Sequence, residues 1–90
     1  MMNYLTIENE EVIKCTTNAI DVIIPNSVIF IGVFVFEGCS NLKTVTIPNS
    51  VTSIEDDTFR YCENIMIHCY KNSYAEEYAK KNNIPCKITD

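Results

Sequence analysis

The segment Ile47-Pro48-Asn49-Ser50-Val51 decides the fold, because it repeats the segment Ile24-Pro25-Asn26-Ser27-Val28 at an offset of 23 residues. Two ungapped windows of 23 residues share nine identities at this offset. Beyond the two segments, the identical pairs are Ile31 and Ile54, Phe36 and Phe59, Cys39 and Cys62, and Asn41 and Asn64. Self-similarity at a fixed period of roughly 20–50 residues is typical of repeat architectures, in which stacked units bury a continuous core.

Each unit predicts the same succession of local structures. In the second unit, residues 42–47 form a short β-rich run that ends at Pro48, because proline has no N–H to donate to a strand ladder. A second short extended piece follows. Asp56 and Asp57 then predict a single helical turn, since acidic side chains favour the positive end of a helix. The side chains of this turn that we expect to point inward are Phe59 and Cys62.

This spacing resembles the 23-residue leucine-rich repeats of the BspA-like type, whose pattern is roughly L-x-x-V-x-I-P-x-S-V-x-x-I-x-x-x-x-F-x-x-C. The second unit, from Leu42 to Cys62, fits that pattern throughout, and the first unit, from Ala19 to Cys39, has alanine in place of the leading leucine. The resemblance implies a short leucine-rich-repeat solenoid of stacked parallel strands and short helical turns. It also implies protein binding across a sheet face.

We expect a single leucine-rich-repeat domain over residues 1–90, divided into four parts. Residues 1–18 predict an N-terminal hairpin cap, 19–41 the first repeat, 42–64 the second repeat, and 65–90 a C-terminal strand, helix and cap. Two repeats fall short of the roughly three units that a solenoid usually needs, so the two ends are expected to supply much of the core.

The C-terminal part carries the signals of a strand followed by a helix. Apolar and polar residues alternate over 65–70, which is typical of a strand with one face inward. Residues 72–81 then predict an α-helix, because Ser73 and Glu76 form a capping-box pattern. The helix residues expected to face the repeats are Ala75, Tyr78 and Ala79, with Tyr74 as a further candidate. A last strand is expected around Cys86 and Ile88.

Charge and composition exclude several classes of partner. The net charge of −5 is unsuited to tracking nucleic-acid phosphates or docking on an anionic membrane, since both need clustered Lys and Arg. No apolar stretch approaches the roughly 20 residues of a membrane span, and no signal peptide is visible at the N-terminus. Five cysteines in no framework pattern indicate free thiols. We therefore expect a cytoplasmic protein.

The sequence predicts no catalytic, cofactor or metal site. A zinc site would need Cys62, His68, Cys69 and Cys86 to converge, but no C-x-x-C pair is present, and strand alternation points His68 and Cys69 to opposite faces. The acid run 55–57 lacks the alternate carboxylates of a calcium loop. No motif pairs His68 with a nucleophile and an orienting carboxylate. We therefore predict that the protein is not an enzyme.

Four of the positions at which the two repeats differ carry Thr, Ser or Asp in the second repeat and large apolar side chains in the first. The apolar residues of the first repeat, called the apolar strip below, are Ile29, Phe30, Val33 and Phe34. Contiguous exposed apolar surface usually marks an interface. Three interpretations stay open: a homodimer patch, a site for another protein, or a locally altered unit that turns these residues inward.

From these observations we expect a small non-enzymatic protein–protein interaction module that forms a homodimer through the apolar strip. One alternative is an acidic inhibitor of a nucleic-acid enzyme, which would require the acidic residues to gather on one surface. Another is a fragment of a cell-surface adhesin array. Those acidic residues are Glu8, Glu10, Glu11, Glu55, Asp56 and Asp57.

Overall fold

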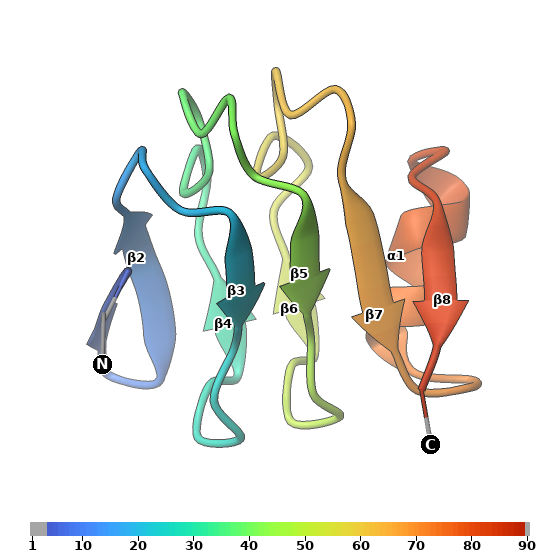
Figure 1. Cartoon of the computed structure of the whole chain (residues 1–90). Coiled ribbons are helices and arrows are strands. Elements are labelled where there is room, and N and C mark those ends of the chain that lie inside the picture. The colour runs from blue at the N-terminus through green and yellow to red at the C-terminus, as the bar shows by residue number, and fades with distance from the viewer. Residues whose placement is uncertain (1–3, 90) are drawn as a thin grey trace.

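Two four-stranded sheets face each other in the computed structural model, which describes residues 4–89 (Figure 1). The first sheet, sheet A, has the order β1-β2-β4-β6, and the second, sheet B, has the order β3-β5-β7-β8. The strands of sheet A are β1 (Leu5–Glu8), β2 (Glu11–Cys15), β4 (Phe30–Ile31) and β6 (Ser53–Ile54). Those of sheet B are β3 (Asp21–Ile23), β5 (Thr44–Thr46), β7 (Met66–Cys69) and β8 (Cys86–Ile88), and the helix α1 spans Tyr74–Lys81.

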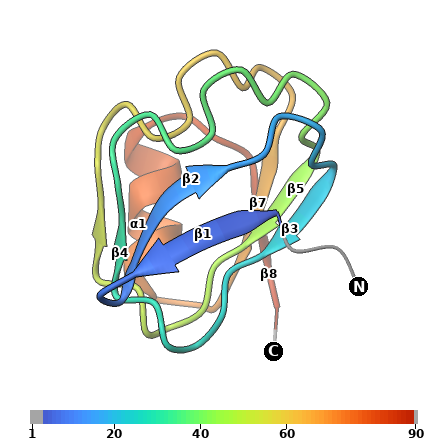
Figure 2. The same ribbon diagram turned by 90° about the vertical axis from the view of Figure 1, so that its left-hand side faces the viewer.

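Strands of successive units pair in parallel, as the repeat predicts. In sheet B, β3 pairs with β5 so that Val22 lies opposite Val45, and in sheet A, β4 pairs with β6 so that Phe30 lies opposite Ser53. Both pairings keep the 23-residue offset of the sequence. The chain therefore passes from sheet B to sheet A and back once in each unit, and the turns of the two units lie side by side (Figure 2).

The predicted N-terminal hairpin is confirmed for the part that the structure describes. β1 and β2 pair antiparallel around a tight turn in which Asn9 and Glu10 have φ values of 52° and 67°. Left-handed conformation at both central residues is the geometry that matches the right-handed twist of paired strands. β2 then pairs in parallel with β4, which joins the hairpin to the first repeat in sheet A. Residues 1–3 of the expected cap lie outside the described residues.

The core lies between the two sheets and is built from residues of equivalent position in successive units. The rings of Phe36 and Phe59 stack with centroids 4.9 Å apart and planes at 3°. Tyr78 of α1 continues this column, with its ring centroid 6.1 Å from that of Phe59. Both phenylalanines are buried, so this aromatic column ties the two repeats to the helix.

The expected helical turn after Asp56 is wrong. The segment contains isolated turns, in which the Thr58 amide donates to the Glu55 carbonyl and the Arg60 amide donates to the Asp57 carbonyl. The reason lies in the backbone: the Thr58 carbonyl accepts from the Phe36 amide of the preceding unit at 3.2 Å, and Tyr61 has a left-handed φ of 69°. The Thr58 hydroxyl also bonds across units, donating to the Gly32 carbonyl at 2.8 Å. A single helical turn gains too few bonds of its own to compete with such contacts.

The helix is confirmed and is shorter than the predicted range. Ser73 is the N-cap, and its hydroxyl accepts from the Glu76 amide at 3.1 Å. The Glu76 carboxylate in turn accepts from the Asn72 amide at 2.7 Å. In a standard capping box the donor would be the amide of Ser73, one residue later. The buried helix residues are Ala75, Tyr78 and Ala79, as predicted, and they face β6, β7 and β8. Among the described residues, no helix has the length and apolar character needed to cross a membrane.

Candidate binding surface

The apolar strip lies on β4 and the turn that follows it, on the outer face of sheet A. Phe30, Val33 and Phe34 are exposed by 43%, 52% and 43%, and Ile29 is half-buried. The backbone amides of Ile29 and Phe30 donate to the Glu10 carbonyl, which fixes the start of the strip to the hairpin. Three of the four side chains of the strip are therefore at the surface, and Phe30 and Val33 line the same groove. The alternative in which these side chains turn inward is not what the fold adopts.

Phe34 has an unusual backbone conformation. Its φ is 60°, in the left-handed region that costs a residue with a side chain roughly 1–2 kcal/mol. The next two residues, Val35 and Phe36, are buried in the core. The left-handed step thus directs a large aromatic ring to solvent while its neighbours point inward.

A shallow groove of about 480 Å³ runs beside the strip. Gly32 forms part of its floor, and a Cβ at this position would lie 2.7 Å from Oε2 of Glu11 and 3.3 Å from the Val12 carbonyl oxygen. The absence of a side chain at Gly32 therefore leaves room for the half-buried Glu11 carboxylate. The residues that line the groove are Glu11, Phe30, Ile31, Gly32, Val33, Ser53 and Glu55.

A β-bulge adds two residues to this face that sequence reasoning missed. The pairing of β1 with β2 shifts register between Thr6 and Ile7, so Ile13 has no partner in β1. As a result Ile13 and Lys14 are both exposed, while Val12 and Cys15 on either side are buried. Alternation along β2 alone would have placed only one of the two outside, and the local sequence gives no signal for the bulge.

The outer face of sheet B, which the family resemblance points to, has a different character. It presents Ile23, which is 75% exposed, next to a ladder of polar side chains on the neighbouring strands. The Thr44 hydroxyl donates to the Asp21 carboxylate at 2.7 Å within this ladder. Sequence reasoning did not single out Ile23. Its side chain stands apart from the strip, because the two sheets face opposite ways (Figure 1).

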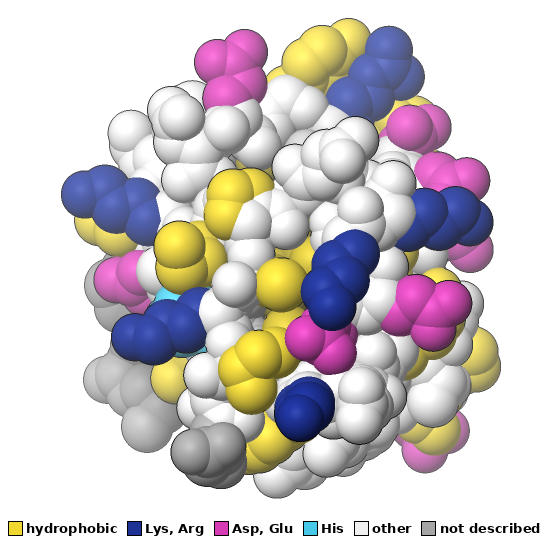
Figure 3. Space-filling model, turned by 90° about the vertical axis from the view of Figure 1, so that its right-hand side faces the viewer, with side chains coloured by type: hydrophobic (Ala, Val, Ile, Leu, Met, Phe, Trp, Pro, Cys, Tyr) yellow, Lys and Arg dark blue, Asp and Glu magenta, His cyan; other side chains and the backbone are white. Residues whose placement is uncertain are grey.

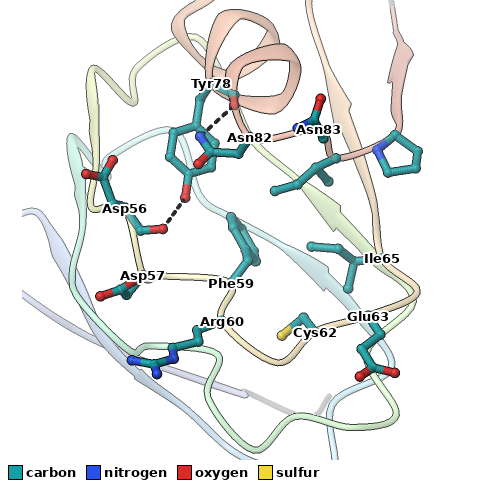
Figure 4. Close-up of a pocket in the computed structure, with 12 residues that line it drawn as sticks. Asp56, Asp57, Phe59, Arg60, Cys62, Glu63, Ile65, Tyr78, Asn82 and Asn83 are labelled. Carbon is teal, nitrogen blue, oxygen red and sulfur yellow. Dashed lines mark hydrogen bonds between the residues drawn. The ribbon is translucent and has the colours of Figure 1, made fainter.

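A second hollow of about 330 Å³ lies at the C-terminal end of the molecule. On this face, apolar side chains gather near the centre and charged side chains of both signs surround them (Figure 3). Phe59, Cys62 and Ile65 form one side of the hollow, and the segment after α1 closes the other (Figure 4). The Tyr78 hydroxyl donates to the carbonyls of Glu55 and Asp56 at 3.0 and 3.3 Å.

The hollow exists because the repeat ends there. The residue equivalent to Cys62 in the first unit, Cys39, is buried by the second unit, whereas Cys62 stays half-buried. The helix covers the strands at this end but leaves the turn of the second unit partly open. The hollow thus lies where the turn of a further unit would pack, and its apolar floor is the end of the core.

Burial raises the pKa of three thiols, one at the end of β2 and one in the turn segment of each repeat. The pKa is about 12 for Cys15 and about 11 for Cys62, and it is raised for Cys39 as well. Cys39 and Cys62 occupy equivalent positions of the two units, and each thiol donates to a carbonyl of a preceding segment: Cys39 to Thr16 at 3.6 Å and Cys62 to Phe36 at 3.2 Å. Neutral thiols of this kind are poor nucleophiles and poor metal ligands.

Of the residues weighed for a zinc site, Cys69 and Cys86 are in side-chain contact, but the four do not meet at one point. His68 is half-buried while the adjacent Cys69 is fully buried, in keeping with the predicted alternation along β7. Within residues 4–89, no group of three or more His, Cys, Asp or Glu side chains is placed to hold a metal ion.

The acidic residues are divided between surfaces. Glu11 and Glu55 line the groove beside the strip, whereas Asp56 and Asp57 line the C-terminal cleft.

The chain is thus a repeat protein whose units pair strand to strand and stack aromatic side chains in a column. A family model described as a BspA type leucine rich repeat region (6 copies) matches residues 5–87. Because the match spans most of the chain, this protein belongs to the BspA-type leucine-rich-repeat family. Neither a search of curated proteins nor a search of solved structures gave a match. Leucine-rich-repeat families commonly mediate protein–protein interaction and are typically non-enzymatic.

Proposed function

We propose that this protein is a small non-enzymatic binding module that pairs with a second copy through the apolar strip. The observation that carries the proposal is the exposure of Phe30, Val33 and Phe34, of which Phe30 and Val33 line the same groove on sheet A. Aromatic side chains at the centre of an interface supply a large share of its binding energy. Ile13, which is 42% exposed, extends the same apolar surface across the neighbouring strand.

The short repeat gives a reason for self-association. We propose that the chain is a two-unit solenoid closed by the β1–β2 hairpin at one end and by α1 at the other. A domain of this size buries only about 60–65% of the surface that its unfolded chain exposes. Burying the strip against a second copy would add apolar contact that two units alone do not supply. The five unpaired cysteines favour a reducing compartment such as the cytoplasm for this pairing.

The test is the molar mass in solution, measured by light scattering behind a sizing column over a hundredfold range of concentration. We expect a wild-type mass near twice the chain mass of 10.3 kDa, with dissociation on dilution. The double variant Phe30→Ser, Phe34→Asp carries the residues of the second repeat at equivalent positions, so it should remain folded and monomeric. A wild type that stays monomeric over the whole range would refute self-association.

A further inference from the structure

We infer that the two copies pack in one orientation, in which Lys14 of each copy lies against Glu55 of the other. The inference rests on the proposed pairing through the strip, and it names the polar contacts that would fix the geometry of that pairing. Its basis is the distribution of charge on either side of the strip on the outer face of sheet A.

The strip lies between two free charges of opposite sign. The strand order β2-β4-β6 places the strip on β4, Lys14 on β2 to one side, and Glu55 directly after β6 on the other. Within residues 4–89, neither the Lys14 ammonium nor the Glu55 carboxylate takes part in an ion pair or a side-chain hydrogen bond. Each copy thus presents an unpaired cation and an unpaired anion on opposite sides of an apolar centre.

A two-fold axis that runs along the strands at β4 brings these charges together. In an isologous pair, any contact between two different residues occurs twice. Rotation about such an axis lays the β2 side of one copy over the β6 side of the other. Lys14 of each copy therefore meets Glu55 of the other, once on each side of the strip. The strands of the two sheets stay aligned, which is a preferred way for sheets to pack face to face.

The same axis also gives the half-buried Glu11 carboxylate a hydrogen-bond donor. Glu11, Phe30 and Ser53 lie opposite one another across β2, β4 and β6. The rotation therefore places the Glu11 carboxylate over the Ser53 hydroxyl of the second copy, with the two Phe30 rings between them. A half-buried carboxylate without a partner is costly, and a hydroxyl donor would offset that cost.

The other two-fold in the plane of the interface, perpendicular to the strands, is less favourable. It lays each strand of one copy over the same strand of the second copy, running in the opposite direction. Lys14 would then lie near Glu11 of the second copy, whereas the two Glu55 carboxylates, which follow β6, would face each other. Like charges juxtaposed across an interface oppose binding, so the axis along the strands is selected.

Charge exchange tests this orientation. We expect Lys14→Glu alone and Glu55→Lys alone to weaken self-association at least about tenfold, because each creates two like-charge contacts. An equimolar mixture of the two variants should regain wild-type affinity as a heterodimer, because both contacts become Lys against Glu. The double variant Lys14→Glu, Glu55→Lys should regain it as a homodimer. The matched control is Lys43→Glu and Glu63→Lys, two exposed sites outside the strip face, which should leave affinity unchanged.

The outcomes separate this inference from the proposed function. A wild type that dimerises but shows no rescue in the mixture would overturn the orientation and leave the pairing intact. Rescue of Lys14→Glu by Glu11→Lys, in place of Glu55→Lys, would overturn it in favour of the axis perpendicular to the strands. A wild type that is monomeric at every concentration would refute the pairing itself.

Discussion

Replacing Thr58 by valine should destabilise the fold through a single buried hydrogen bond between the two units. The Thr58 side chain is fully buried, and its hydroxyl donates to the Gly32 carbonyl at 2.8 Å. Valine has nearly the same shape, so packing is kept while the buried carbonyl loses its donor. An acceptor left unsatisfied in this way costs about 1–3 kcal/mol. In a domain of about this size, each kcal/mol lowers the thermal midpoint by roughly 4–8 °C.

The repeat offers a built-in comparison for this substitution. The carbonyl equivalent to that of Gly32 in the second unit is that of Glu55, and it accepts from the Tyr78 hydroxyl at 3.0 Å. Tyr78→Phe should cost less than Thr58→Val, about 0.5–1.5 kcal/mol, because the Glu55 carbonyl keeps the Thr58 amide as a donor. Thr17→Val is the control, since Thr17 is exposed. Urea unfolding at one protein concentration measures all three. A midpoint for Thr58→Val equal to that of Thr17→Val would refute the argument.

Three further predictions follow from the core, the helix and the thiols. Phe36→Ala should cost about 3–5 kcal/mol, since it opens a cavity beside Phe59, and urea unfolding would contradict this if the loss stayed below 1 kcal/mol. Ser73→Ala should cost about 0.5–2 kcal/mol through loss of the N-cap, with Ser73→Asp as a variant that keeps it, checked by thermal melts followed by circular dichroism. Stability should fall as the pH rises above about 9, because Cys15 and Cys62 have pKa values of about 12 and 11 when folded and the unfolded thiols ionise earlier. Melts between pH 8 and about 11 with a reductant present check this, and Cys62→Ala should reduce the slope.

The sequence predicted the parts of the fold that depend on local pattern and on the repeat. The identity of residues 24–28 and 47–51 was enough for the parallel pairing of the units, because equivalent residues of stacked units meet at a constant offset. Alternation over 65–70 gave the correct inward face of β7, and Ser73 gave the correct start of α1. In each case the signal lies within one short segment or recurs at the fixed offset of the repeat.

The parts that were missed depend on contacts between segments that are distant in sequence. The exposure of Lys14 follows from a bulge that forms only when β2 pairs with β1. The turn after Asp56 is not helical because the Thr58 carbonyl accepts from the Phe36 amide of the preceding unit. The groove beside the strip joins Glu11 of β2 to Glu55, which directly follows β6. No pattern along the chain specifies such contacts.

The two repeats also show which side chains the fold requires and which side chains are free to contact a partner. The identical pair Phe36 and Phe59 is buried, and the two rings stack upon one another. At the strip, Phe30 of one unit lies in register with Ser53 of the other, and the same backbone accepts both. Because the second unit forms its strand with serine there, the fold does not require phenylalanine at that place. An exposed aromatic side chain that the fold does not need, in a protein that gains nothing by exposing it to water, is best explained by a surface that covers it.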